Sequence, residues 1–244
     1  MSFLTLPSGR YLVGSHPDEE HSFDDEVRHE VHLARAFLIQ VTPVTQARWR
    51  RLMGTEPSHF KGDDLPVERV SWFDAIACAN ALSRQEGLPE VYLEDGSLRD
   101  DRRSVYETLG YRLPTEAEWE VACRAGTTTA WYCGDDPAGV GAIAWTADQA
   151  CEGTRPVAGK QANALGLYDM TGNVAEWVHD FYGPWTEDLA SDPSGPESGD
   201  TRVVRGGSWN NDAIFARSAY RNDPLEPDTR DFWVGFRLAR TVIG

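Results

Sequence analysis

The stretch that decides the fold reads Gly166-Leu167-Tyr168-Asp169-Met170-Thr171-Gly172-Asn173-Val174-Ala175-Glu176-Trp177. Its polar side chains carry oxygen, the ligand atom that calcium prefers. Gly172 permits a tight turn that directs backbone carbonyls inward. We therefore predict a structural calcium site formed by Asp169, Thr171, Asn173 and Glu176. The alternative is that Asp169 caps a following helical turn and that Glu176 pairs with an arginine.

This stretch lies within residues 127–244, a region that has almost no helical periodicity and is rich in Gly, Asn, Asp, Pro and Trp. Such a segment is held by turns and by side-chain-to-backbone hydrogen bonds. Strands are predicted at residues 201–205 and at 234–238, where apolar residues alternate with the period of a half-buried strand. The irregular stretch between them, residues 210–233, is long enough to indicate a function.

The chain before residue 127 shows more regular patterns. Apolar runs predict strands within residues 3–40, and residues 88–110 are predicted to form a hairpin and loop. Three helices are predicted, which begin at Thr42-Pro43, Ser71 and Thr115 and end at Gly54, Gly87 and Gly126. The sequence has no internal repeat and no long linker, so we expect one domain over residues 1–244.

An acidic stretch at residues 16–30 contains several histidines, which suggests a metal site. We favour an exposed polar loop instead, because the stretch has no apolar periodicity. His29 and His32 lie three residues apart at a strand entry, where alternation points them to opposite faces.

The charge and cysteine content exclude several classes of function. Lysine plus arginine number 23 and aspartate plus glutamate 39, a net charge of −16. Such a surface repels nucleic acid and anionic membranes, so neither is an expected partner. No apolar window spans a membrane and no signal peptide is apparent, so we expect a cytoplasmic protein. Its four cysteines lack zinc spacing and are expected to be free thiols, with a Cys133–Cys151 disulfide as the alternative for an exported protein.

Four motifs together carry a family resemblance: residues 110–120 (GYRLPTEAEWE), residues 166–177, Arg205-Gly-Gly-Ser-Trp209 and Val234-Gly-Phe-Arg-Leu238. Their order and spacing resemble the formylglycine-generating enzyme family, also called sulfatase-modifying factor domains. The resemblance implies an α+β protein with a C-type lectin-like fold, a few helices and small antiparallel sheets. It also implies a calcium site at the positions that match Asp169, Asn173 and Glu176.

The sequence departs from the enzymes of this family where their chemistry occurs. Those enzymes oxidise a substrate cysteine with copper held by two cysteines just after the Gly-Gly-Ser-aromatic motif. This chain has Asn210, Asn211 and Asp212 there, and no cysteine follows Cys151. Copper(I) prefers soft thiolates, which these side chains lack. We therefore predict no copper and no catalytic residue.

The segment 210–233 combines aromatic rings with short polar side chains, as adaptable recognition surfaces do. Its layout resembles the C-terminal segment of variable proteins diversified by retroelements. The predicted ligand-binding residues are Asn210, Asn211, Asp212, Ile214, Phe215, Tyr220, Asp223, Thr229, Asp231, Phe232 and Trp233, with Asn222 and Arg221 in the same stretch. The alternative is that Phe215, Phe232 and Trp233 only pack the loop against the core. Arg217, Arg221 and Arg237 are expected to form structural salt bridges.

The sequence thus predicts a non-catalytic family member that binds a protein or other ligand through its C-terminal loop surface. The alternative hypothesis is a metal-dependent oxidoreductase of the same family whose site the sequence does not locate. Neither the ligand nor the oligomeric state is predicted.

Overall fold

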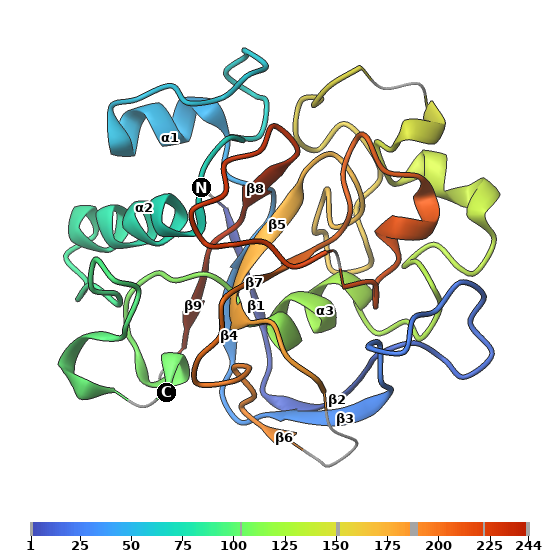
Figure 1. Ribbon diagram of the computed structural model, residues 1–244, viewed down its shortest axis with the longest axis horizontal. Coiled ribbons are helices and arrows are strands. Elements are labelled where there is room, and N and C mark those ends of the chain that lie inside the picture. Colours follow the sequence, from blue (N-terminus) through green and yellow to red (C-terminus); the bar gives the residue numbers. More distant parts are fainter. Residues whose placement is uncertain (1, 103, 150–151, 186–189, 222, 243–244) are drawn as a thin grey trace.

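The computed structural model describes all residues except 1, 103, 150–151, 186–189, 222 and 243–244. Three small sheets lie around a shared core (Figure 1). Their strand orders are β1-β4-β9, β2-β3-β6 and β7-β5-β8. The strand bounds are β1 Phe3–Leu6, β2 Gly9–Val13, β3 His29–Leu33, β4 Phe37–Gln40, β5 Ala175–Phe181, β6 Ala190–Ser191, β7 Arg202–Arg205, β8 Val234–Phe236 and β9 Ala239–Thr241. The predicted α+β class is confirmed.

Three α-helices occur, all in the first half of the chain that the structure describes: α1 Gln46–Met53, α2 Trp72–Gln85 and α3 Glu116–Arg124. Short 3-10 helices are η1 Arg99–Asp101, η2 Val105–Glu107, η3 Pro137–Ala142, η4 Ala147–Gln149 and η5 Ala213–Ala216. Capping boxes at Ser71 and Thr115 begin α2 and α3 as predicted, because each side chain accepts from the N–H three residues on.

The predicted start of the first helix is wrong. Thr45, not Thr42-Pro43, caps α1, and its side chain accepts from the Arg48 N–H. The preceding Val44 instead donates its N–H to the Phe236 carbonyl, which ties this segment to β8 as extended chain. The predicted end at Gly54 is confirmed, and its φ of 73° is the left-handed conformation that favours glycine.

Strand β5 is central to its sheet, and sequence patterning missed it. It pairs antiparallel with β7 and parallel with β8. Most of its residues are buried, so apolar and polar residues do not alternate along it. Trp177 in β5 and Trp72 in α2 are fully buried and donate their indole N–H groups to the Val70 and Val178 carbonyls. These bonds join α2 to the sheet.

The alternating stretch at residues 234–238 is buried on both faces rather than half-buried. Only its first three residues form a strand, β8, and β9 begins just after it at Ala239 in a different sheet. A Cβ at Gly235 would lie 2.5 Å from the Val67 carbonyl oxygen, so this position needs glycine. The polar member of the pattern, Arg237, points into an ion pair inside the protein rather than to solvent.

Cys78 and Cys123 are buried in α2 and α3 as free thiols, and Cys133 is exposed and free. The alternative disulfide involves Cys151, which lies outside the described residues. Among the helices of the described residues, none has the length and apolar character needed to cross a membrane.

Candidate functional site

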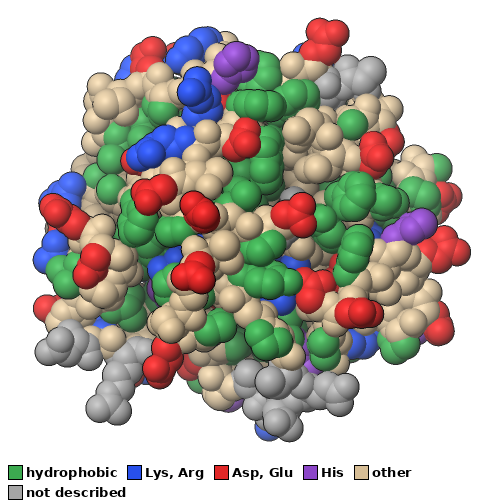
Figure 2. Space-filling view, viewed as in Figure 1, with side chains coloured by type: hydrophobic (Ala, Val, Ile, Leu, Met, Phe, Trp, Pro, Cys, Tyr) green, Lys and Arg blue, Asp and Glu red, His purple; other side chains and the backbone are tan. Residues whose placement is uncertain are grey.

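The loop at residues 210–233 separates into two kinds of position. Its buried positions are Ala213, Ala216, Arg217, Ser218, Ala219 and Arg221. The predicted binding residues are all exposed or half-buried: Asn210, Asn211, Asp212, Ile214, Phe215, Tyr220, Asp223, Thr229, Asp231, Phe232 and Trp233. Asn222 lies outside the described residues. We call the first set the anchor positions and the second the displayed positions. The loop crosses the face turned to the viewer in Figure 1, where acidic and hydrophobic side chains are interspersed (Figure 2).

Arg217 fixes the first part of this loop. Its guanidinium donates to Glu26 at 2.7 Å and to Glu19 at 2.6 Å, and all three side chains are buried. Burial alone would lower the pKa of Arg217, but Glu26 and Glu19 raise it above its ordinary value. The prediction that residues 16–30 form a purely solvated loop is therefore wrong for Glu19 and Glu26. The predicted structural role of Arg217 is confirmed.

Helix α3 fixes the second part through its glutamates. Arg221 donates to both oxygens of Glu116, at 2.8 and 2.9 Å. Arg205, at the end of β7, donates to Glu116 and to Glu120, at 2.8 and 2.6 Å. These side chains are almost fully buried. A helix from the first half of the chain thus holds the C-terminal segment by charge-assisted hydrogen bonds.

The displayed aromatic side chains form two separate clusters. In the Trp209 cluster, the Trp209 ring lies 5.9 Å from Phe232 and 5.5 Å from Phe60, measured between centroids. In the Phe215 cluster, Tyr220 lies 5.4 Å from Phe215 and 5.5 Å from Phe23. Phe232 and Phe23 remain 40% and 49% exposed. Trp233 instead packs against the core.

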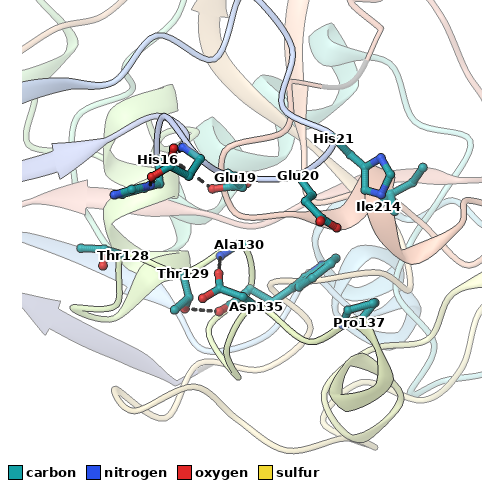
Figure 3. A pocket seen from close by; sticks show the side chains of 12 residues that line it. His16, Glu19, Glu20, His21, Thr128, Thr129, Ala130, Asp135, Pro137 and Ile214 are labelled. Atoms are coloured by element: carbon teal, nitrogen blue, oxygen red, sulfur yellow. Dashed lines mark hydrogen bonds and ion pairs between the residues drawn. The ribbon is translucent and has the colours of Figure 1, made fainter.

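A cavity of about 570 Å³ borders Ile214. Residues of the acidic loop and of the segment 128–137 line it (Figure 3). Its lining includes the carboxylates of Asp18, Glu19, Glu20 and Asp135, and no lysine or arginine among the residues that the structure describes. Sequence patterning missed this cavity, because the two segments that form it lie more than a hundred residues apart.

The four predicted calcium ligands lie in one turn and the strand that follows it. Asp169, Gly172 and Asn173 have φ values of 52°, 72° and 64°, so the predicted tight turn is present. Asp169 accepts from the Ala158 N–H at 2.7 Å and from the Asn173 amide at 3.3 Å. The Asn173 amide exchanges two further bonds with the backbone of Arg155, each 3.0 Å long.

Glu176 does not fit a calcium ligand as it is placed. Arg237 donates to both of its oxygens at 2.7 Å, and Trp119 donates to one of them at 2.9 Å. This is the pairing of Glu176 with an arginine that the sequence offered as the alternative to calcium.

Asp169 is buried, and burial raises its pKa. Thr171 Oγ1 is buried without a hydrogen-bond partner in the described part of the chain. No cluster of three or more His, Cys, Asp or Glu suited to a metal occurs among the described residues. The calcium site at Asp169, Thr171, Asn173 and Glu176 therefore stays a prediction, which would require Glu176 to leave its pair with Arg237.

Where the copper-binding enzymes of the family have cysteines, this chain has side chains with oxygen atoms, Asn210 and Asn211. The Ser208 hydroxyl lies 2.5 Å from Asn210 Oδ1 and 2.6 Å from Asn211 Oδ1. Further along the loop that follows this motif, Ser218 Oγ lies 3.7 Å from Cys123 Sγ. Burial raises the pKa of Cys123 to about 11 and that of Cys78 to about 12, so both resist thiolate formation. These residues do not fit a copper ion.

The sulfatase-modifying factor enzyme 1-like domain model matches residues 1–242, nearly the whole chain. The chain belongs to this family. Variable protein 1 of Treponema denticola has a similar structure, with a TM-score of 0.87 and 34% identity over 98% of this chain and 94% of that one. The C-type lectin-like fold of the formylglycine-generating enzyme type is thereby confirmed.

Two curated relatives extend the comparison. Chaperone protein LppX of Paenibacillus barcinonensis is 36% identical over 75% of this chain and 73% of its own length. The formylglycine-generating enzyme of Mus musculus is 32% identical over 90% of this chain, which covers 56% of the mouse protein. The chain therefore spans only about half the length of that enzyme.

Proposed function

We propose that this chain is a non-catalytic member of the sulfatase-modifying factor family that binds a protein or other ligand through the displayed positions of residues 210–233. The observation that carries the proposal is the division of this loop. Buried arginines hold its backbone, while side chains between them stay accessible. A recognition surface gains affinity when its backbone is fixed before binding, because less conformational entropy is lost.

The chemistry of the displayed side chains supports recognition. The Trp209 and Phe215 clusters present partly exposed rings, which supply contact area with few rotatable bonds. Asp212, Asp223 and Asp231 supply hydrogen-bond acceptors around them. The similarity to a protein named as variable supports the same interpretation. A reverse transcriptase gene beside this one, with a template repeat matching residues 205–238, would extend the proposal to retroelement diversification.

Copper-dependent thiol oxidation is the weaker candidate. It requires accessible thiolates after the Gly-Gly-Ser-aromatic motif, and this sequence has none there. The competing hypothesis of an oxidoreductase is tested by incubating the copper-supplemented protein with a cysteine-bearing peptide. Formation of formylglycine above the level of a heat-treated control would overturn the non-catalytic proposal.

The binding proposal is tested by affinity capture with matched variants. We expect F215A/F232A to fold and to lose specific partners that the wild type retains. The control L12A/L165A removes two leucines outside the loop that are about as exposed as Phe232, and it should keep those partners. W233A is left out, because Trp233 packs against the core. An identical partner set for wild type and F215A/F232A, with both folded, would contradict the proposal.

A further inference from the structure

None of the described residues that line a second cavity, of about 690 Å³, belongs to the segment 210–233, although Arg202 in its wall pairs through its backbone with Leu225 of that segment. The cavity is bounded by residues 95–98, 102 and 105, by the end of β5, by residues 194–197 and by the first residue of β7. Part of its wall is apolar, formed by Leu98, Val105, Phe181 and Pro196. The volume is within the range of small-molecule sites, which combine apolar walls with a few polar groups.

Arg202 lines this cavity and is 6% exposed. Its guanidinium lies between two rings, 3.7 Å from the Trp72 centroid and 3.4 Å from the Phe181 centroid. Nη1 donates to the His179 carbonyl at 2.6 Å. Nε is buried and has no hydrogen-bond partner among the described residues. The rings hold the plane of the guanidinium but leave most of its N–H donors unused.

Arg202 differs in this respect from every other buried arginine that the structure describes. Those six, Arg112, Arg124, Arg205, Arg217, Arg221 and Arg237, each form an ion pair with a glutamate. Arg202 forms none with the residues that the structure describes. A buried charge without a counter-charge is costly. Within the described part of the chain, this guanidinium has no carboxylate at ion-pair distance, and its Nε has no hydrogen-bond partner.

The charged groups nearby do not neutralise Arg202. Asp180 lies next to the site, but it forms no ion pair with Arg202, and burial and Glu116 raise its pKa well above the ordinary value, which favours its neutral form. Asp95 and Glu197 lie on exposed parts of the lining. Arg102 adds a second cation to the wall. His179 stays neutral near pH 7, because burial, with Arg202 and Arg112 nearby, lowers its pKa to about 3.

We propose that this cavity binds a small organic anion whose carboxylate or phosphate group pairs with Arg202 and whose apolar part contacts Leu98, Val105 and Phe181. The anion would supply the counter-charge that the protein omits. Guanidinium groups bind both kinds of oxyanion through paired N–H donors. Among the described residues no displayed position lines this cavity, so the proposal is tested separately from the binding function proposed above.

Titration calorimetry with benzoate, phenyl phosphate and benzamide tests the proposal. All three share the ring, and benzamide is the neutral isostere of benzoate. At constant ionic strength we expect wild type to bind at least one anion and to bind benzamide roughly tenfold more weakly or not measurably. The tighter of the two anions identifies the preferred head group.

Two variants locate the binding. S194F fills the cavity at a position whose side chain forms no hydrogen bond with the described residues, and R202Q removes the charge. Each should weaken anion binding by roughly tenfold or more. R10M removes an exposed arginine and the same charge, and should bind as wild type does. If R202Q does not fold, S194F still decides the matter. Absence of anion binding by wild type, or unchanged binding by S194F, would overturn the proposal.

Discussion

The helical part of the molecule, from α1 to α3, and the C-terminal part are stabilised by different means. The helices begin at capping residues and bury apolar faces, so local sequence specifies them. The C-terminal part has strands of at most seven residues and long irregular connections. Its position depends on buried arginines whose partners are distant in the sequence, such as Arg217 with Glu26. Irregular backbone can thus be fixed as firmly as a helix.

This difference matters for function. A loop fixed by a few buried side chains leaves its other positions free of structural constraint. The same arrangement makes the anchors indispensable, because removing one member of a buried pair leaves an uncompensated charge. The comparison therefore predicts large effects at the arginines and small effects at helix caps.

The largest effect is expected for R237M. Arg237 and Glu176 are fully buried, and the substitution leaves Glu176 with only the Trp119 donor. We expect the free energy of unfolding to fall by about 3–5 kcal/mol. Denaturant unfolding measures it. The exposed Arg230, paired with Asp74, is the matched control, and R230M should cost less than about 1 kcal/mol. Equal losses for both variants would show that burial does not govern these pairs.

A smaller effect is expected from the titration of His179. Its folded pKa of about 3 lies below the unfolded value of roughly 6.5. The unfolded state therefore binds more protons between these values, and stability falls as the pH drops through this window. The loss is at most about 1.4 kcal/mol per pH unit. In H179Q this contribution is absent, so its unfolding free energy should depend less on pH between about pH 6.5 and 5. Parallel curves for both proteins would refute the assignment.

Loss of a helix cap should reduce the free energy of unfolding by less than loss of a buried ion pair does. Ser71 Oγ accepts from the Asp74 N–H at 3.1 Å. We expect S71A to reduce the free energy of unfolding by about 1 kcal/mol. The same denaturant series measures it. A loss as large as that of R237M would remove the contrast between the two parts of the molecule.

Calcium has the smallest expected effect, because Glu176 is held by Arg237. Binding at the predicted site of Asp169, Thr171, Asn173 and Glu176 would raise the melting temperature of wild type when calcium replaces EDTA, and D169N should not respond. Identical melting of wild type in calcium and EDTA would contradict the calcium prediction and leave the ion pair as the role of Glu176.

Sequence patterns predicted the elements whose signals are local. The capping boxes at Ser71 and Thr115 and the turn at Gly172 are examples, since each depends on residues a few positions apart. Strand β5 was missed because burial on both faces removes alternation. The exposed character assigned to the acidic loop failed at Glu19 and Glu26, because their partner Arg217 lies about two hundred residues away. Composition could indicate that the arginines form salt bridges but not with which glutamates.

The candidate site shows the same division. The aromatic and polar composition of residues 210–233 indicated an accessible surface, and its exposure agrees. The two cavities and the unpaired Arg202 could not be predicted, since each depends on segments brought together only by the fold. The family motif could not reveal that Arg237 donates to both oxygens of Glu176, because the two residues lie 61 positions apart and only the fold brings them together.

Anchor and displayed positions occur together within one loop. Saturation mutagenesis of residues 210–233, with folding stability read from resistance to proteolysis, tests this division directly. We predict that most substitutions at Ile214, Phe215, Asp223 and Phe232 change the free energy of unfolding by less than about 0.5 kcal/mol. At Ala216, Arg217 and Arg221 we predict losses of about 2 kcal/mol or more. Uniform sensitivity, or uniform tolerance, across the two sets would contradict the account.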